Sequence, residues 1–332
     1  MTITTNPLTA PAGQTNAEPS GGGSRILSVG TALPDGVLTN ADFEEMMDTD
    51  DAWIRSRTGI AERRVGGTTT DLAIGAARSA LERSGIDRDL VDLVIVATQT
   101  PDDLCPSTAA GVQHALGLEC GAFDLNAACA GFSYGLVTAH AMLGAGHRAA
   151  IVVGVDRMTA ATNYEDRSTA ILFGDGAGAV VLTAEPGGDR GVLAWDAGTD
   201  GGHPDILRSP IKDGQVTGVE MDGKAVFKLM VRYAATSATR AVERAGLTFD
   251  DLSAVLAHQA NQRILDAVAD RLGVDRSRFV SVIEHTGNTS AASVPLALEA
   301  AVEDGRVRSG DRVLLLGFGG GLSWASTVAV WG

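Results

Sequence analysis

The sequence is short of cysteine and of basic residues. Among its 332 residues there are three cysteines, and 26 basic residues stand against 41 acidic ones. Three cysteines are too few for a disulfide framework, which indicates a reducing compartment, and we expect a cytoplasmic protein. No two cysteines form a C-x-x-C pair and no histidine pair has the spacing of zinc ligands, so no metal is expected.

The charge balance and the absence of long apolar runs exclude two further classes of protein. A formal net charge of −15 argues against a nucleic-acid partner, whose binding surface would be basic. No run approaches the roughly 18 apolar residues of a spanning helix, so no membrane segment is expected. With 45% hydrophobic and 20% charged residues, the chain has the composition of a globular protein with a large core.

The beginning of the chain differs from the rest. Residues 1–24 are rich in Thr, Pro, Ala, Asn and Gly, and we predict a disordered tail there. From Arg25 onward, apolar runs such as 93–97 and 150–153 alternate with Ala-rich helical stretches. Runs without a polar face are typical of strands buried on both sides. The pattern therefore predicts a layered α/β fold.

Two parts of the chain repeat one another. The predicted helices over 72–86 and 233–247 share identical residues at one offset, as in Ala73 and Ala234, which lie 234 − 73 = 161 positions apart. Residues 151–154 match residues 314–317 at an offset of 163. Two matches in the same order indicate a duplication. We predict two similar halves, 25–190 and 191–332, with an active site where they meet.

Cys129 lies where a short strand is expected to turn into a helix. The N-terminus of a helix presents unpaired N–H groups and a partial positive charge, which would favour the thiolate, the nucleophilic form of cysteine. Free cysteines are also common as small core residues. Both interpretations remain open for Cys129 on its own, and Cys120 is read as structural.

Two further polar residues follow predicted strands. His258 follows the strand 254–257, and Asn288 follows a strand predicted over 279–283. Ligands bind at the carboxyl ends of strands in α/β sheets. Adding the offset of 161 to Cys129 gives Ser290, so the turns that carry Cys129 and Asn288 occupy equivalent places in the two halves. We expect them to converge.

These segments resemble a known family. Four segments are similar to the β-ketoacyl-acyl-carrier-protein synthase III enzymes of the thiolase superfamily. They are A-A-C-A-G-F at 127–132, H-Q-A-N at 258–261, G-N-T-S-A-A-S at 287–293 and G-F-G-G-G at 317–321. The resemblance runs from about Arg25 to Gly332. It implies a thiolase fold, with a duplicated αβαβα five-layer architecture of two pseudo-symmetric halves, and a homodimer.

The resemblance also implies a reaction. Cys129 would take an acyl group from acyl-CoA, with the backbone N–H groups of Cys129 and Gly320 as the oxyanion hole. Malonyl on an acyl carrier protein would then lose CO2, with His258 and Asn288 stabilising the enolate, and the carbanion would attack the acyl-enzyme. No metal or redox cofactor is implied. The priming step would belong to fatty acid or aromatic polyketide biosynthesis.

Binding residues carry over in the same way. The resemblance implies that Trp53 and Arg167 hold the adenine of CoA, that Arg57 contacts phosphate, and that Lys228 and Arg263 receive the carrier protein. Asp270 stands where other members carry Lys, which weakens that patch. The implied acyl pocket consists of Cys105 from the partner subunit together with Met158, Leu172, Phe173, Met221, Gly223 and Phe318. A Cys at 105, where acetyl-primed members have Phe, leads us to expect primers longer than acetyl.

Two other functions remain open. One is an acyltransferase of the same fold, which would pass the acyl group to a carrier thiol or a small acceptor without condensation. The other is a catalytically silent subunit that holds an acyl carrier protein. The presence of His258 and Asn288 favours condensation, because a hole that stabilises an enolate is of use only there.

Overall fold

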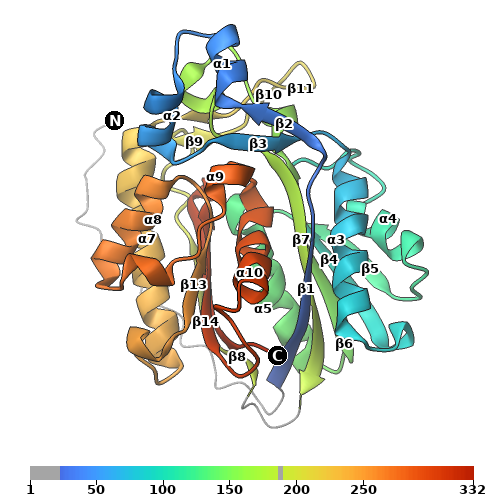
Figure 1. The fold of residues 1–332 in the computed structure, drawn as a ribbon. Helices are drawn as coiled ribbons and strands as arrows, with labels where there is room; N and C mark the ends of the chain where they lie inside the picture. The colour runs from blue at the N-terminus through green and yellow to red at the C-terminus, as the bar shows by residue number, and fades with distance from the viewer. Residues whose placement is uncertain (1–22, 186–189) are drawn as a thin grey trace, which may run out of the picture.

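The computed structural model describes residues 23–185 and 190–332. Two β-sheets alternate with three layers of helices, one on each outer face and one between the sheets. The chain thus forms the five layers that were predicted (Figure 1). Residues 1–22 of the predicted tail lie outside the described residues, whereas Gly23 and Ser24 already belong to the first strand. In the described ranges, no helix combines the length and the hydropathy that a membrane span requires.

The first sheet contains the strands of the N-terminal half. Its spatial order is β1 (Gly23–Ala32), β7 (Asp175–Glu185), β6 (Ala149–Arg157), β4 (Val91–Ala97) and β5 (Gly121–Leu125). Helices α3 (Thr69–Ser84) and α4 (Thr108–Ala115) cover its outer face. Ala73, Ala77 and Ala80 are fully buried, because small side chains let α3 lie close against the sheet. The helix ends at Gly85 with a φ of 66°, as the glycine there predicted.

The second sheet belongs to the C-terminal half and repeats this plan. Its order is β13 (Ala254–Ala257), β14 (Arg312–Gly319), β15 (Ser323–Val330) and β8 (Gly191–Thr199). Helices α7 (Gly223–Arg244) and α8 (Gln262–Leu272) pack on its outer face. The strands β6 and β14, which contain the repeated residues 151–154 and 314–317, lie at matching places in the two sheets.

The central layer consists of α5 (Gly131–Gly144) and α10 (Ser293–Glu303), which lie between the sheets (Figure 1). Phe132 and Leu136 of α5 and Val294 and Leu298 of α10 form one apolar cluster with both sheets. The short 3-10 turns η2 (Ala128–Ala130) and η6 (Ser290–Ala292) lead into these two helices. Both helices therefore begin at the same end of the molecule.

Shorter elements cap that end (Figure 1). They are β2 (Gly36–Thr39), α1 (Asn40–Met46), α2 (Asp51–Thr58), β3 (Glu62–Val65), α6 (Arg167–Ala170), β9 (Leu207–Arg208), β10 (Ile211–Lys212), β11 (Gln215–Val216), β12 (Glu220–Met221) and α9 (Ile283–Thr286).

The two halves meet through a pair of equivalent glycines. A Cβ on Gly154 of β6 would lie 2.3 Å from the carbonyl oxygen of Ala291, in the turn of the C-terminal half. A Cβ on Gly317 of β14 would lie 3.1 Å from the Cα of Ala130, in the turn of the N-terminal half. Each half thus provides the flat strand surface on which the turn of the other half rests.

The strand predicted over 279–283 is wrong. Only Phe279 makes a bridge, to Val255, and Ile283 already begins α9. The side chain of the buried Gln259 takes the place of a neighbouring strand: its Nε2 donates to the carbonyl of Val280 at 3.1 Å, and its Oε1 accepts from the N–H of Val282 at 3.0 Å. The segment is apolar because Val280 is buried. The Gln259 side chain, rather than a neighbouring strand, provides the hydrogen bonds to the Val280 carbonyl and the Val282 N–H.

This arrangement predicts that Gln259 is required for stability. Gln259→Met keeps the side-chain volume but removes three hydrogen bonds, including one to the carbonyl of Ala257, from a buried site. At about 1 kcal/mol each, we expect the free energy of unfolding to fall by about 3 kcal/mol. Chemical denaturation measures the change. The control Gln215→Met, on an exposed strand, should change stability by less than about 0.5 kcal/mol. Equal effects of the two substitutions would contradict the assignment.

Candidate active site

A cavity of about 100 Å³ lies at the carboxyl ends of β5, β6, β13 and β14. Cys129, His258 and Asn288, which come from three separate parts of the sequence, all line it. The structure thus brings together the three residues that the sequence analysis singled out. The backbone of Gly320, the predicted second oxyanion donor, lines it too.

Cys129 sits in the turn η2 between β5 and α5, the strand-to-helix position that was predicted. The equivalent turn of the other half faces it, because the hydroxyl of Ser290 donates a hydrogen bond to Cys129 Sγ at 3.3 Å. The predicted convergence of the two turns is therefore confirmed. The backbone N–H groups of Cys129 and Gly320 also lie near enough to the sulfur to lower its pKa.

The expectation that this position favours the thiolate is wrong for the resting thiol. Burial raises the pKa of Cys129 to about 11, and the nearby carboxyl of Asp156 raises it further. The hydrogen bonds from Ser290, Cys129 N–H and Gly320 N–H lower the pKa, but by less than burial raises it. Desolvation of the charged form is larger here than the favourable hydrogen bonds. Cys129 is therefore protonated at neutral pH.

His258 is buried beside Cys129 and carries no charge at neutral pH. Burial lowers its pKa to about 3, and a backbone hydrogen bond with Ser290 only partly offsets this effect. Its Nδ1 lies 3.1 Å from the hydroxyl of Ser293, and its ring packs edge-on against Phe318 at a centroid distance of 5.2 Å. These contacts hold the ring in one orientation at the cavity wall.

Asn288 is fixed through its backbone and through one end of its side chain. Its N–H donates to the carbonyl of Leu172 at 2.8 Å, and its own carbonyl accepts from Gly174 at 3.1 Å. Its Oδ1 accepts from the N–H of Ser290 at 2.9 Å. Because the acceptor end of the amide is occupied, the Nδ2 donor end is the part that a ligand in the cavity can use.

The glycine segment 317–321 approaches Cys129 so closely that side chains are excluded at one position. A Cβ on Gly319 would lie 2.6 Å from the Cβ of Cys129 and 3.1 Å from its Sγ. At Gly320 the nearest atom would be the Cβ of Ala128 at 3.5 Å, an ordinary contact. Of the two glycines beside the turn that carries Cys129, Gly319 therefore needs to be a glycine for reasons of space, and Gly320 does not.

Most of the predicted acyl-pocket residues line the cavity, namely Met158, Leu172, Phe173, Met221 and Phe318. Two do not. Gly223 begins α7 and lies outside the lining, because Met221 and Val226 fill that wall. Cys105 is exposed on a loop, so its proposed place in the pocket of a partner subunit stays a prediction.

The sequence analysis missed several lining residues: Gln99, Leu207, Arg208, Ser209, Val219, Val226, Met230, Ala260, Asn261 and Ile264. One signal was available, since Val226 and Met230 lie one turn apart on the buried side of α7. Gln99 and the residues 207–209 come from connecting segments, where no periodicity marks the residues that face inward.

The predicted nucleotide site lies on the capping elements. The guanidinium groups of Arg167 and Arg57 lie 4.8 Å and 5.8 Å from the centre of the Trp53 ring. Trp53 also packs against the apolar cluster that contains the cavity residues Met158 and Leu172. The three predicted residues are therefore close together and adjoin the cavity.

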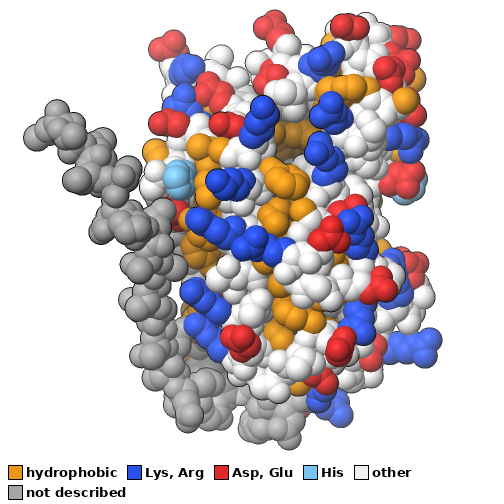
Figure 2. Space-filling model, turned by 90° about the vertical axis from the view of Figure 1, so that its left-hand side faces the viewer, with side chains coloured by type: hydrophobic (Ala, Val, Ile, Leu, Met, Phe, Trp, Pro, Cys, Tyr) orange, Lys and Arg blue, Asp and Glu red, His pale blue; other side chains and the backbone are white. Residues whose placement is uncertain are grey.

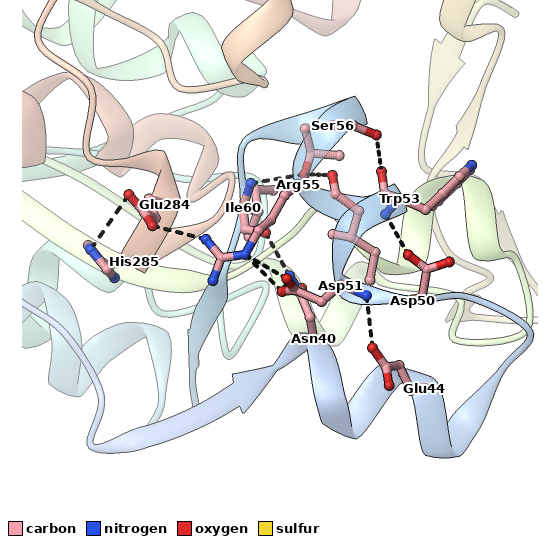
Figure 3. Close-up of polar contacts among 12 residues, drawn as sticks. Asn40, Glu44, Asp50, Asp51, Trp53, Arg55, Ser56, Ile60, Glu284 and His285 are labelled. Carbon is pink, nitrogen blue, oxygen red and sulfur yellow. Dashed lines mark hydrogen bonds and ion pairs between the residues drawn. The ribbon is translucent and has the colours of Figure 1, made fainter.

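Polar contacts fix the helix that carries Trp53 (Figure 3). The side chain of Asp50 caps α2 by accepting from the N–H of Trp53 at 2.7 Å. Arg55 bonds Asp51 on the same helix at 2.8 Å and reaches Glu284 of α9 at 3.0 Å. Figure 3 shows the Trp53 side chain pointing away from these groups. The helix is thus anchored on one side and leaves Trp53 accessible on the other.

Lys228 and Arg263 are exposed on the outer helices α7 and α8. Neither forms an ion pair within residues 23–185 and 190–332. Figure 2 views this side of the molecule and shows Lys and Arg side chains gathered around exposed hydrophobic surface. Asp270 pairs with Arg276 at 2.6 Å, so its negative charge is balanced locally.

Comparisons with known proteins agree with this geometry. Two family models match, 3-oxoacyl-[acyl-carrier-protein] synthase III over residues 123–201 and the C-terminal region of the same family over residues 242–331. The β-ketoacyl-[acyl-carrier-protein] synthase III 1 of Bacillus anthracis is 43% identical over 312 residues, 92% of this chain and 98% of that protein. The synthase III of Geobacillus kaustophilus is 44% identical over 316 residues, 93% of this chain and 99% of that protein.

Solved structures are also similar to this chain over most of its length. The 3-oxoacyl-(acyl carrier protein) synthase III of Pseudomonas aeruginosa has a TM-score of 0.89 at 43% identity, covering 93% of this chain and 98% of its own. The priming β-ketosynthase of the R1128 polyketide pathway has a TM-score of 0.89 at 39% identity, covering 96% and 99%. The fold is the thiolase fold, and the chain belongs to the 3-oxoacyl-[acyl-carrier-protein] synthase III family.

Proposed function

We propose that the protein is a priming condensing enzyme, which joins an acyl-CoA starter to malonyl-acyl carrier protein and forms a β-ketoacyl-acyl carrier protein. The observation that carries the proposal is the shared cavity of Cys129, His258 and Asn288, with the backbone N–H groups of Cys129 and Gly320 near the sulfur. The names of the relatives agree, as they include a β-ketoacyl-[acyl-carrier-protein] synthase III and a priming β-ketosynthase of a polyketide pathway.

In the first step Cys129 Sγ attacks the thioester carbonyl of acyl-CoA. A new C–S bond forms to the enzyme, the bond to the CoA sulfur breaks, and CoA leaves as the thiol with the proton that Cys129 gives up. Negative charge develops on the carbonyl oxygen during the attack, and the N–H groups of Cys129 and Gly320 stabilise it. Acylation needs no charge on His258, which is neutral in the structure.

In the second step the malonyl group loses CO2 and leaves an enolate. With its proton on Nε2, His258 would donate one hydrogen bond to the enolate oxygen, while the contact of Nδ1 with the Ser293 hydroxyl at 3.1 Å holds the ring. The Nδ2 group of Asn288 donates the other. Two neutral donors in a desolvated cavity stabilise charge that appears only as CO2 departs. The carbanion then attacks the acyl carbon, a C–C bond forms, and the C–S bond to Cys129 breaks. The sulfur leaves as a thiolate and takes up a proton from water, because its own proton left with CoA in the first step.

The remaining partners follow from surface features. The basic residues Lys228 and Arg263 suit an acidic carrier protein. A homodimer is supported by the edge strand β5, whose Phe123 is 36% exposed, and by the exposed Leu104 and Cys105 on the loop nearby. The reaction requires neither metal nor redox cofactor, and we place the enzyme in the cytoplasm, in fatty acid or aromatic polyketide biosynthesis.

Intact-mass measurement tests the proposal. Cys129 should gain an acyl mass from a panel of acyl-CoAs and lose it when malonyl-acyl carrier protein is added, as the β-ketoacyl product forms. Asn288→Ala should load normally but condense at least about 100-fold more slowly, because one enolate donor is gone.

Three other outcomes point elsewhere. Discharge to another acceptor without a ketoacyl product, unaffected by Asn288→Ala, would identify an acyltransferase. Absence of loading by any acyl-CoA or acyl carrier protein, with binding of the carrier protein retained, would identify a silent carrier-binding subunit. Loading of Cys129 from an acyl carrier protein, but from no acyl-CoA, would make the acyl carrier protein the donor of the starter group in place of acyl-CoA.

The two neighbouring glycines give a matched pair of variants. Gly319→Ala forces the strand end away from Cys129, and a displacement of about 1 Å in a reacting group costs about 100-fold in rate. We expect acyl loading to slow by about this factor. Gly320→Ala has room for the methyl group and keeps its N–H, so loading should stay within about tenfold of the wild type. Single-turnover acylation measures both rates, and equal losses would argue against the assigned oxyanion hole.

The length of the primer depends on what closes the pocket. The cavity of one subunit is lined mainly by apolar side chains such as Met158, Leu172 and Phe318, which suit an acyl chain. We propose that Cys105 of a partner subunit closes its far end. Cys105→Phe should therefore shift selectivity toward acetyl-CoA, measured by competition between acyl-CoAs of different length. Unchanged selectivity would show that Cys105 does not limit the pocket.

A further inference from the structure

Ser290 touches all three residues of the proposed reaction. Its hydroxyl donates to Cys129 Sγ at 3.3 Å, its N–H donates to Asn288 Oδ1 at 2.9 Å, and its backbone hydrogen-bonds His258. It is fully buried, and its φ of 51° lies in the left-handed region, which few residues other than glycine adopt. The surrounding structure therefore holds this residue in an uncommon conformation at the centre of the site.

A second side chain determines the direction in which the hydroxyl donates. Nε2 of Gln99 donates to Ser290 Oγ at 2.9 Å. Because the amide N–H occupies the oxygen as an acceptor, the hydroxyl proton of Ser290 is left for another partner. Two acceptors are near it: the carboxyl of Asp156, with which the Ser290 side chain also hydrogen-bonds, and Cys129 Sγ, on which the 3.3 Å bond places the proton. Gln99 also lines the cavity, where its Nε2 contacts the sulfur of Met158 at 3.5 Å.

A buried carboxylate fixes the distance between Gln99 and Ser290. Oδ1 of Asp156, on β6, accepts from the N–H of Gln99 at 2.8 Å, and Oδ2 accepts from the N–H of Ala291 at 3.2 Å. Hydroxyls of Thr98 and Thr100 also donate to Oδ1, at 3.1 Å and 3.0 Å. Asp156 so joins the end of β4, in one half, to the turn η6 of the other half.

We propose that Ser290 is a further catalytic residue, whose hydroxyl stabilises the Cys129 thiolate at the moment of acyl transfer, and that Gln99 and Asp156 are the positioning residues that orient this hydroxyl. The inference rests on the proposed role of Cys129 as the nucleophile. A hydrogen bond to a charged group contributes more than one to a neutral group, so the Ser290 bond strengthens as the proton leaves the sulfur. The Ser290 hydrogen bond thus stabilises the thiolate more than it stabilises the resting thiol.

The charged and titratable groups around the sulfur are few. Asp156 lies behind the turn, His258 lies on the opposite wall and is neutral, and Arg208 lines the cavity from β9. Asp156 disfavours the thiolate by its charge, while it orders the two donors that favour it. Removing the hydroxyl of Ser290 leaves all three groups in place, which makes Ser290 the position to test.

Thiolate absorbance gives the direct test. The ultraviolet absorbance of the thiolate is followed from neutral to alkaline pH as the difference from Cys129→Ala, which removes the signals of Cys105 and Cys120. Ser290→Ala should move the midpoint upward by about one pH unit, equivalent to about tenfold less thiolate at any pH below it. Alkylation of Cys129 by iodoacetamide at neutral pH should slow by about the same factor.

Further variants separate the role of the hydroxyl from an effect on folding. Ser290→Gly removes the hydroxyl in a residue that adopts positive φ readily, so it keeps the backbone where Ser290→Ala fails to fold. Gln99→Leu should shift the midpoint in the same direction but by less. Ser326→Ala removes a buried hydroxyl bonded to Ser237 at 2.8 Å, far from the site, and should lower stability without moving the midpoint.

An unchanged midpoint in both Ser290→Ala and Ser290→Gly would overturn the inference, since a purely structural role does not alter the equilibrium between thiol and thiolate. The absorbance experiment uses no substrate. Failure of the wild-type protein to take an acyl group would therefore contradict the proposed function, and would do so independently of this result.

Discussion

The architecture depends on the close approach of two turns to two glycines. Gly154 and Gly317 occupy equivalent strands, and each lies against the start of the central helix of the opposite half. A Cβ on Gly154 would lie 2.3 Å from the carbonyl oxygen of Ala291, and one on Gly317 would lie 2.7 Å from Ser133 Oγ and 3.1 Å from the Cα of Ala130. This exchange places the starts of α5 and α10 side by side at one end of the central layer. Cys129 and Asn288 meet because their helices begin there, and His258 joins them because β13 lies next to β14 in the adjoining sheet.

The chemistry of the site follows from burial more than from charge. Desolvation keeps Cys129 protonated and His258 neutral at the same pH, so the resting cavity holds a neutral pair rather than an ion pair. The two proposed enolate donors are fixed by partners, as Ser293 fixes His258 and the N–H of Ser290 fixes the Asn288 amide. Donors that are oriented in advance need no reorganisation when charge develops.

Much of this organisation can be read from the sequence, because duplication leaves a periodic signal. The offset of 161 that relates the two predicted helices also relates Cys129 to Ser290, which are in contact. The segment 279–283 was misassigned since the partner of its backbone is a side chain, Gln259, which no strand pattern reveals. The pKa of Cys129 was misjudged since a helix N-terminus is visible in a sequence, whereas the depth of burial depends on how all five layers pack.

The contact between Arg167 and Trp53 has a consequence for turnover. At 4.8 Å from the ring centre, the guanidinium occupies the space that a flat base would need. In the proposed CoA site, a nucleotide that inserts between them would first break a cation–π contact of about 0.5–1 kcal/mol, which would reduce its affinity by a factor of about two to five. In the proposed reaction the arriving thioester and the departing CoA carry the same nucleotide. The contact between Arg167 and Trp53 would then weaken binding of the product as much as binding of the substrate, and would favour rapid exchange over tight binding.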